Sequence, residues 1–153
     1  LERAQGPGFL TMIHGSEPAY AGTMAVRTPF PPAGPEARYV YEFRETQAAG
    51  EFVRAKWRAL FHESLAAAGL VRDDLAYCFF HQTHGAQVDD LVADLGLAPT
   101  SAIRVVADHG NMGTPTFAVA LARGFSGLGP GDKYVLQAVG GGVSWCAIVA
   151  EHR

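Results

Sequence analysis

The feature that most constrains the fold is an alternation of apolar runs and helix-spaced segments that starts at residue 76. The apolar runs are continuous, as in strands buried on both faces, and the segments between them repeat apolar residues every three or four positions. The expected elements are a strand at 76–80, a helix at 88–95, a strand at 103–107, a helix at 115–124, and strands at 134–139 and 143–149. This βαβαββ order predicts an α/β fold with a mixed, mostly parallel sheet that ends in an antiparallel pair.

The residues before position 76 predict three short strands and one long helix. The strands are expected at 8–13, 23–27 and 39–43, with prolines at positions 29, 31, 32 and 35 between the last two. Proline cannot donate to a strand ladder and fixes φ, so this stretch is expected to be a linker or crossover loop. The helix presents one apolar face and ends at Gly69, and that face consists of Val53, Trp57, Leu60, Phe61, Ser64 and Ala68.

The composition favours a single globular domain and excludes some partners. The 153 residues are 48% hydrophobic and carry a net charge of −3 without a block of Lys or Arg, which argues against nucleic acid or an acidic membrane. Cys78 and Cys146 lie in apolar runs and are expected to be buried thiols, so the expected localisation is cytoplasmic. No apolar stretch reaches membrane-spanning length, and the first residues lack the pattern of a signal peptide. No initiator methionine precedes Leu1, so the chain is expected to be a fragment or a processed piece.

Two polar side chains follow neighbouring strands of the predicted sheet. His81 comes directly after the strand at 76–80, and Asn111 occupies the equivalent corner of the next strand–helix unit. The carboxyl ends of parallel strands form the edge at which open α/β sheets bind ligands. Both corners precede helices, whose partial positive charge disfavours imidazolium. A neutral imidazole and an amide could donate to one carbonyl oxygen and stabilise an enolate or a tetrahedral oxyanion.

A third element is the glycine run at 140–142, between the last two strands. Its backbone N–H groups could point at a reacting oxygen, because glycine allows a close approach of the main chain. On these residues alone, a hairpin with a glycine bulge is the favoured interpretation.

The segments "HQTHG", "DHGNMGTP" and "GGGVSW", in this order and at these separations, resemble the C-terminal half of β-ketoacyl-acyl-carrier-protein synthase III. These are condensing enzymes of the thiolase superfamily. The resemblance implies a thiolase-like layered fold, with residues 1–45 ending the N-terminal half and connecting it to a C-terminal domain at 46–153. It also implies that His81 and Asn111 are catalytic and that Gly141 belongs to the oxyanion hole. The family's nucleophilic cysteine lies in the other half, and neither Cys78 nor Cys146 matches it.

The activity implied by this resemblance is decarboxylative Claisen condensation of an acyl thioester with a malonyl thioester, in fatty acid or polyketide biosynthesis. The implied partners are acyl-CoA, a malonyl thioester, an acyl carrier protein, the N-terminal half of the same enzyme and a second copy in a homodimer. No metal and no bound cofactor are implied. The sequence departs from the family at His84, where Asn is usual, and at Ala86, where a basic residue is frequent. The second departure puts the contact with a carrier protein in doubt.

Several alternatives remain open from the residues. His81, His84 and His109 could bind zinc, although their spacing is not that of the common zinc motifs. His84 is otherwise expected to be a pocket-wall or helix-start residue that contacts the substrate or a carrier protein. Arg54 and Arg58 could bind a carrier protein or CoA phosphates, but a solvated helix face is the simpler interpretation. Three aromatic residues could line an acyl channel or belong to the core, namely Tyr20, Phe30 and Trp57. Alternative functions are a non-condensing acyltransferase that acts on an alcohol or amine, and a non-catalytic partner subunit.

Overall fold

The computed structural model describes residues 8–26, 34, 41–44 and 46–153 of the chain. Its main sheet has the strand order β1-β6-β5-β4. The strands are β1 (Phe9–Ser16), β4 (Leu75–Phe80), β5 (Lys133–Gly140) and β6 (Ser144–Glu151). A separate two-stranded ribbon consists of β2 (Met24–Val26) and β3 (Tyr41–Phe43). β4 and β5 pair in parallel, and the pairs β5–β6 and β6–β1 are antiparallel.

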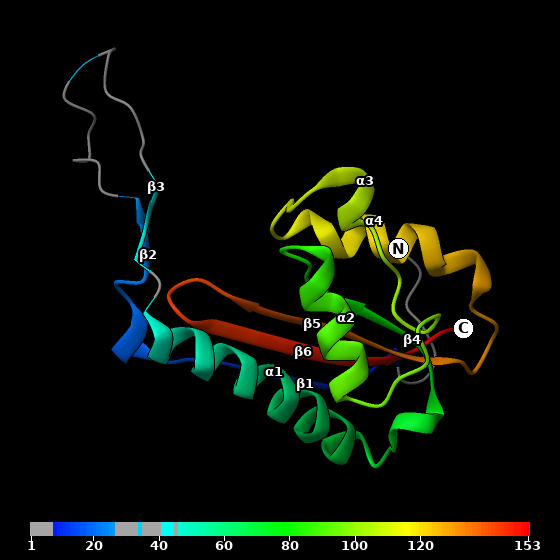
Figure 1. Cartoon of the computed structure of the whole chain (residues 1–153). Coiled ribbons are helices and arrows are strands. Elements are labelled where there is room, and N and C mark those ends of the chain that lie inside the picture. The colour runs from blue at the N-terminus through cyan, green and yellow to red at the C-terminus, as the bar shows by residue number, and fades with distance from the viewer. Residues whose placement is uncertain (1–7, 27–33, 35–40, 45) are drawn as a thin grey trace.

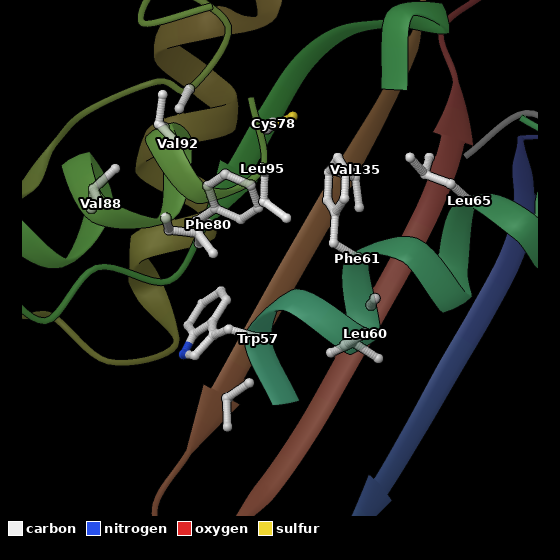
Figure 2. Close-up of a cluster of buried hydrophobic side chains, with 14 of the residues drawn as sticks. Trp57, Leu60, Phe61, Leu65, Cys78, Phe80, Val88, Val92, Leu95 and Val135 are labelled. Atoms are coloured by element: carbon white, nitrogen blue, oxygen red, sulfur yellow. The ribbon is translucent and has the colours of Figure 1, made fainter. Parts of the chain in front are cut away.

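Helices cover the main sheet unequally on its two faces (Figure 1). The helices are α1 (Gln47–Ala68), α2 (Gly85–Asp94), α3 (Val106–His109) and α4 (Pro115–Gly124), with single 3₁₀ turns at Pro18–Tyr20, Arg72–Asp74 and Phe125–Gly127. α1 and α2 bury the larger core cluster against one face, and Figure 2 shows its side chains meeting between α1, α2 and the strands. A smaller cluster around Phe79, Val105 and Ala120 lies under α4 on the other face. The site is therefore built on a core that fixes the carboxyl ends of β4 and β5.

The long helix α1 confirms the prediction from apolar spacing. The hydroxyl of Thr46 accepts the Ala49 N–H at 3.1 Å and caps the N-terminus. Gly69 ends the helix at φ +68, in the left-handed region that favours glycine. Trp57, Leu60 and Phe61 on the predicted face are buried. In the described part of the chain, every helix is too short or too polar to cross a lipid bilayer.

The strand predicted at 103–107 is wrong. Only a parallel bridge between Ala102 and Cys78 forms there, and Val106 already begins α3. The reason is Gln82, whose fully buried carboxamide takes the hydrogen bonds that a strand would make. Its Nε2 donates to the Ile103 carbonyl at 2.7 Å, and its Oε1 accepts from the Val105 and Val106 N–H groups at 2.9 and 3.0 Å. The thiolase-like mixed α/β sheet is confirmed. Among the described strands of the main sheet, however, one neighbouring pair is parallel and two are antiparallel, so "mostly parallel" is corrected.

The first strand extends further than predicted and joins the main sheet. β1 continues to Ser16, where it pairs with Ser144 of β6. Residues 9–16 thus belong to the same sheet as the domain expected at 46–153, while the division at residue 45 stays a prediction. The proline-rich stretch and Phe30 lie outside the described residues, as do the first two residues of the strand predicted at 39–43.

Candidate active site

A cavity of about 760 Å³ opens at the carboxyl ends of β4 and β5. Its walls come from β2, α1, the β4–α2 corner, α2, the loop after α3 and the β5–β6 turn. All six residues predicted for the site line it: His81, Asn111, Gly141, His84, Arg54 and Arg58. The fold therefore brings together side chains that are up to 87 positions apart in the sequence (54 to 141). This clustering supports the predicted site, although the role of each residue stays a prediction.

His81 is held at the end of β4 by the sheet itself. Its backbone N–H donates to the Gln137 carbonyl at 2.9 Å and extends the parallel ladder by one bond. Burial lowers the pKa of the half-buried imidazole below its ordinary value of 6.5, and a hydrogen bond to the backbone of Gly113 opposes this lowering. Because that bond raises the pKa, the ring donates and the Gly113 carbonyl oxygen accepts. The lowered pKa favours a neutral imidazole at pH 7.

Asn111 follows α3 in an exposed loop and is oriented by the same glycine. The Gly113 N–H donates to Asn111 Oδ1 at 3.0 Å, which fixes the oxygen side of the carboxamide. The amide nitrogen has no acceptor among the described residues, so it can donate to a bound molecule. Gly113 adopts φ +66, and a Cβ at this position would meet no atom within 4 Å. Backbone conformation, not space, therefore favours glycine here.

Gly141 lies in the turn between β5 and β6, at the wall formed by β2. A Cβ built on Gly141 would lie 2.6 Å from Met24 Sδ and 2.8 Å from Met24 Cβ. Any larger residue would thus displace Met24 or the turn. No local sequence pattern indicated Met24, because its contact with Gly141 joins two segments that are distant in the sequence.

His84 has an observed structural role at the start of α2. Its Nδ1 accepts the Gln87 N–H at 3.2 Å, so the imidazole caps the helix. Nε2 is then the nitrogen that carries the proton in the neutral ring, and the residue also lines the cavity. This agrees with the expectation of a pocket-wall or helix-start residue.

The two arginines differ in their partners. Arg58 forms an ion pair with Asp94 of α2, including a 2.8 Å hydrogen bond from Nε. Arg54 has no hydrogen-bond or ion-pair partner among the described residues. Arg54 therefore remains able to bind an anionic group at the cavity, whereas Arg58 would first have to leave Asp94.

Neither cysteine belongs to the cavity wall. Burial raises the pKa of the Cys78 thiol to about 12, and burial also raises that of Cys146. The raised pKa of each thiol disfavours the reactive thiolate, in agreement with the expectation that neither cysteine is the nucleophile. In the described ranges, no three His, Cys, Asp or Glu side chains are grouped as metal ligands. His109 instead lies 3.5 Å from Arg123.

The aromatic residues considered for an acyl channel separate in the structure. Tyr20 packs against Phe52 at the margin of the core, with ring centroids 5.1 Å apart. Trp57 belongs to the core and also lines the cavity. Trp57 is thus a core residue at the cavity wall, and its part in an acyl channel stays a prediction.

A mixed sheet between helices, with a histidine and an asparagine brought to one cavity at its carboxyl edge, defines a thiolase-like α/β protein. The family model for the 3-oxoacyl-[acyl-carrier-protein (ACP)] synthase III C terminal matches residues 65–152. The chain belongs to this family.

Curated relatives agree with that assignment, and a solved structure agrees with the fold. β-Ketoacyl-[acyl-carrier-protein] synthase III of Dinoroseobacter shibae is 32% identical over 96 residues, which are 61% of this chain and 30% of the relative. The enzyme of the same name from Rhizobium rhizogenes is 34% identical over 85 residues, 54% of this chain and 26% of the relative. The crystal structure of β-ketoacyl-[acyl-carrier-protein] synthase III from Thermus thermophilus has a TM-score of 0.84 at 21% identity, covering 99% of this chain and 48% of that one. The chain thus matches between a quarter and a third of the length of these curated relatives and about half of that solved chain.

Proposed function

We propose that the chain supplies the His81–Asn111 part of an active site for decarboxylative Claisen condensation of an acyl thioester with a malonyl thioester. The observation that carries the proposal is the shared support of both side chains by Gly113 at one cavity. Membership of the synthase III family supports the same reaction. A nucleophilic cysteine would come from the half of the enzyme that lies outside this sequence.

The condensation can be followed through the residues of the cavity. Asn111 Nδ2 donates to the thioester carbonyl oxygen of the malonyl group. The His81 N–H leaves the Gly113 carbonyl and donates to the same thioester oxygen. Breaking of the bond to the carboxylate then releases CO₂, and the electron pair passes into an enolate that these donors stabilise. The enolate carbon attacks the acyl–cysteine carbonyl, whose oxyanion is stabilised by the Gly141 N–H. Collapse gives the 3-oxoacyl thioester and a cysteine thiolate, which takes up a proton.

The contact of His81 with Gly113 also favours a second candidate function. If the neutral ring keeps its single N–H on Gly113, its other nitrogen is an acceptor and can act as a general base. A base at this position suits the transfer of an acyl group to an alcohol or amine. In that reaction Asn111 would have no enolate to stabilise.

A two-step assay on the complete enzyme separates these functions. His81→Ala should abolish release of CO₂ from the malonyl thioester while formation of the acyl–cysteine stays measurable, and His84→Ala should affect mainly substrate affinity. A larger loss of decarboxylation for His84→Ala than for His81→Ala would reverse the assignment. Acyl transfer to an alcohol or amine that survives Asn111→Ala and falls as His81 is protonated would favour the second function.

The proposed partners are acyl-CoA, a malonyl thioester, an acyl carrier protein, the N-terminal half and a second copy of the enzyme in the cytoplasm. The carrier protein has the weakest support at α2. This helix carries three exposed aspartates, Asp89, Asp90 and Asp94. It also has Ala86 at a position where a basic residue is frequent. Asp89 and Asp94 also pair with Arg104 and Arg58. α2 itself contains no Lys or Arg, so an acidic partner would find no cation on this helix and would have to approach on the side of Arg54.

A further inference from the structure

Trp57 lines the cavity and carries a hydrogen-bond donor that is unpaired among the described residues. The residue is 3% exposed and contributes to the cavity wall, and its indole Nε1 is buried without a hydrogen-bond partner in the described part of the chain. Buried Trp N–H groups normally find an acceptor, because leaving one unpaired is unfavourable. An acceptor that arrives with a bound molecule would account for this donor.

The indole is also fixed in place, so it cannot easily turn to find a protein partner. Its ring contacts Phe80 edge-on, with centroids 6.0 Å apart and planes at 81°. The Trp57 carbonyl accepts from the buried Gln137 Nε2 at 2.7 Å, which holds the backbone. In Figure 2 the indole nitrogen lies at the margin of the core cluster, on the side away from Phe61 and Val135.

The surroundings of Trp57 indicate the kind of acceptor. Trp57 shares its buried cluster with three other residues of the cavity wall, Leu91, Val139 and Val143, and Val53 packs against that cluster. In such a wall a single donor selects a molecule that is mostly apolar and carries an oxygen at one position. Carbonyl oxygens of a thioester or of an amide have this chemistry.

We propose that Trp57 Nε1–H donates to a carbonyl oxygen of the arm that carries the substrate thioester, and that Trp57 thereby helps to determine which thioesters bind. This inference rests on the proposed function, because it takes a thioester as the occupant of the cavity. The carbonyl belongs either to the thioester itself or to an amide of its arm. Ligands with and without amides distinguish the two possibilities.

The test is an NMR titration of the complete enzyme in which only these 153 residues carry ¹⁵N. It follows the indole N–H signals of the two tryptophans of the chain, Trp57 and Trp145. Trp145 is the matched control because it lies beside Phe52 and Lys56 and does not line the cavity. Trp57→Phe and Trp145→Phe each remove one indole N–H signal and so assign both. The ligands are acetyl-CoA, S-acetyl-N-acetylcysteamine with one amide, and S-ethyl thioacetate with none.

We expect acetyl-CoA to move the Trp57 indole signal downfield and to leave that of Trp145 unchanged. Trp57→Phe should weaken acetyl-CoA binding by about 3- to 10-fold, the usual effect of one neutral hydrogen bond, and Trp145→Phe should not. A shift with S-ethyl thioacetate assigns the acceptor to the thioester carbonyl, and a shift only with the larger ligands assigns it to an amide.

Two negative results are distinguishable. If acetyl-CoA binds but the Trp57 signal does not move, the role of Trp57 is disproved while the proposed function stands. If none of the thioesters binds the wild-type protein, the proposed function itself fails. Should Trp57→Phe fold poorly, the shift measured in the wild-type protein still decides the question.

Discussion

At the scale of single residues, Asn111 is the site residue whose chemistry can be changed with least change of shape. Its Oδ1 is held by the Gly113 N–H, while its amide nitrogen is unpaired among the described residues. Asn111→Asp keeps the acceptor for Gly113 and replaces the donor with a charged oxygen. Asn111→Ala removes both.

We expect both variants to lose condensation, because removal of one oxyanion donor raises the barrier by on the order of 3 kcal/mol, or roughly a hundredfold in rate. Asp should be worse than Ala at neutral pH, since its charge repels the enolate and raises the pKa of His81. Formation of the acyl–cysteine should suffer less. Radiolabelled acyl-enzyme formation followed by condensation measures both steps, and unchanged condensation in both variants would contradict the role of Asn111.

His81 gives a prediction about pH. Burial lowers its pKa in the folded protein, so the folded state binds fewer protons than the unfolded state just below pH 6.5. The ionisation of His81 therefore has no effect on the free energy of unfolding above pH 6.5. As the pH falls from 6.5 to the lowered pKa of the folded state, it reduces the free energy of unfolding. An NMR titration of the His81 ring should give a midpoint below 6.5, with His81→Phe as the assignment control. A midpoint above 6.5 would show that the Gly113 bond outweighs burial.

His81 and Asn111 could be chosen as site candidates because each follows a recognisable local pattern: His81 ends an apolar run, and Asn111 precedes a proline that opens a helix. Gly141 was a site candidate only through the resemblance to the synthase III family, because its glycine run alone favoured a hairpin bulge. Met24 and the unpaired Nε1 of Trp57 were not predictable, because a contact or a missing partner across the fold leaves no local pattern.

At the scale of the elements, apolar periodicity predicted three helices, since each buries one face in the core. The predicted apolar face at 53–68 lies in α1 at 47–68, the helix predicted at 88–95 is α2 at 85–94, and the helix predicted at 115–124 is α4. Apolar periodicity failed at 103–107, where apolar residues are buried by packing under α4 but are not paired as a strand. The side-chain amide of Gln82 takes the place of the strand-to-strand hydrogen bonds there. A single glutamine after a strand carries no sign of this role.

Gln82→Met should therefore destabilise the protein more than its size suggests. The variant keeps the length of the side chain but leaves the Ile103 carbonyl and the Val105 and Val106 N–H groups without their partner. A loss of about 2–4 kcal/mol is expected for unpaired buried groups. Gln47→Met on the exposed first turn of α1 is the control, with a change within about 0.5 kcal/mol. Urea unfolding compares the two, and equal midpoints would show that Gln82 is not structural.

At the scale of the whole molecule, one face of the sheet has no helix over β6 and β1 within the described residues. α4 packs on β4, and beyond it lie Cys146 and Ile148 of β6 and Met12 of β1, which is 60% exposed. Met12 and Ile148 are directly paired in the ladder, so they form one apolar surface. Such a surface is unfavourable in water unless another protein layer covers it.

We therefore expect the 153-residue chain alone not to be a stable monomer. It should associate or melt without cooperativity, and covering by the other half of the enzyme should restore a sharp transition. Ile148→Lys should reduce self-association, whereas Lys133→Ala at the far end of the sheet should not. Analytical ultracentrifugation with thermal melting measures this, and a monodisperse monomer with a cooperative transition would count heavily against it.

Gly113 has a consequence for how such a site can change over evolutionary time. One residue orients the asparagine through its N–H and meets the histidine through its carbonyl, and its φ of +66 strongly favours glycine. Substitutions at positions 81, 111 and 113 are therefore epistatic, because the effect of each depends on what occupies the other two. Loss of the glycine would relax selection on both side chains together, so descendants of this chain should keep the three residues as a set or lose them as a set.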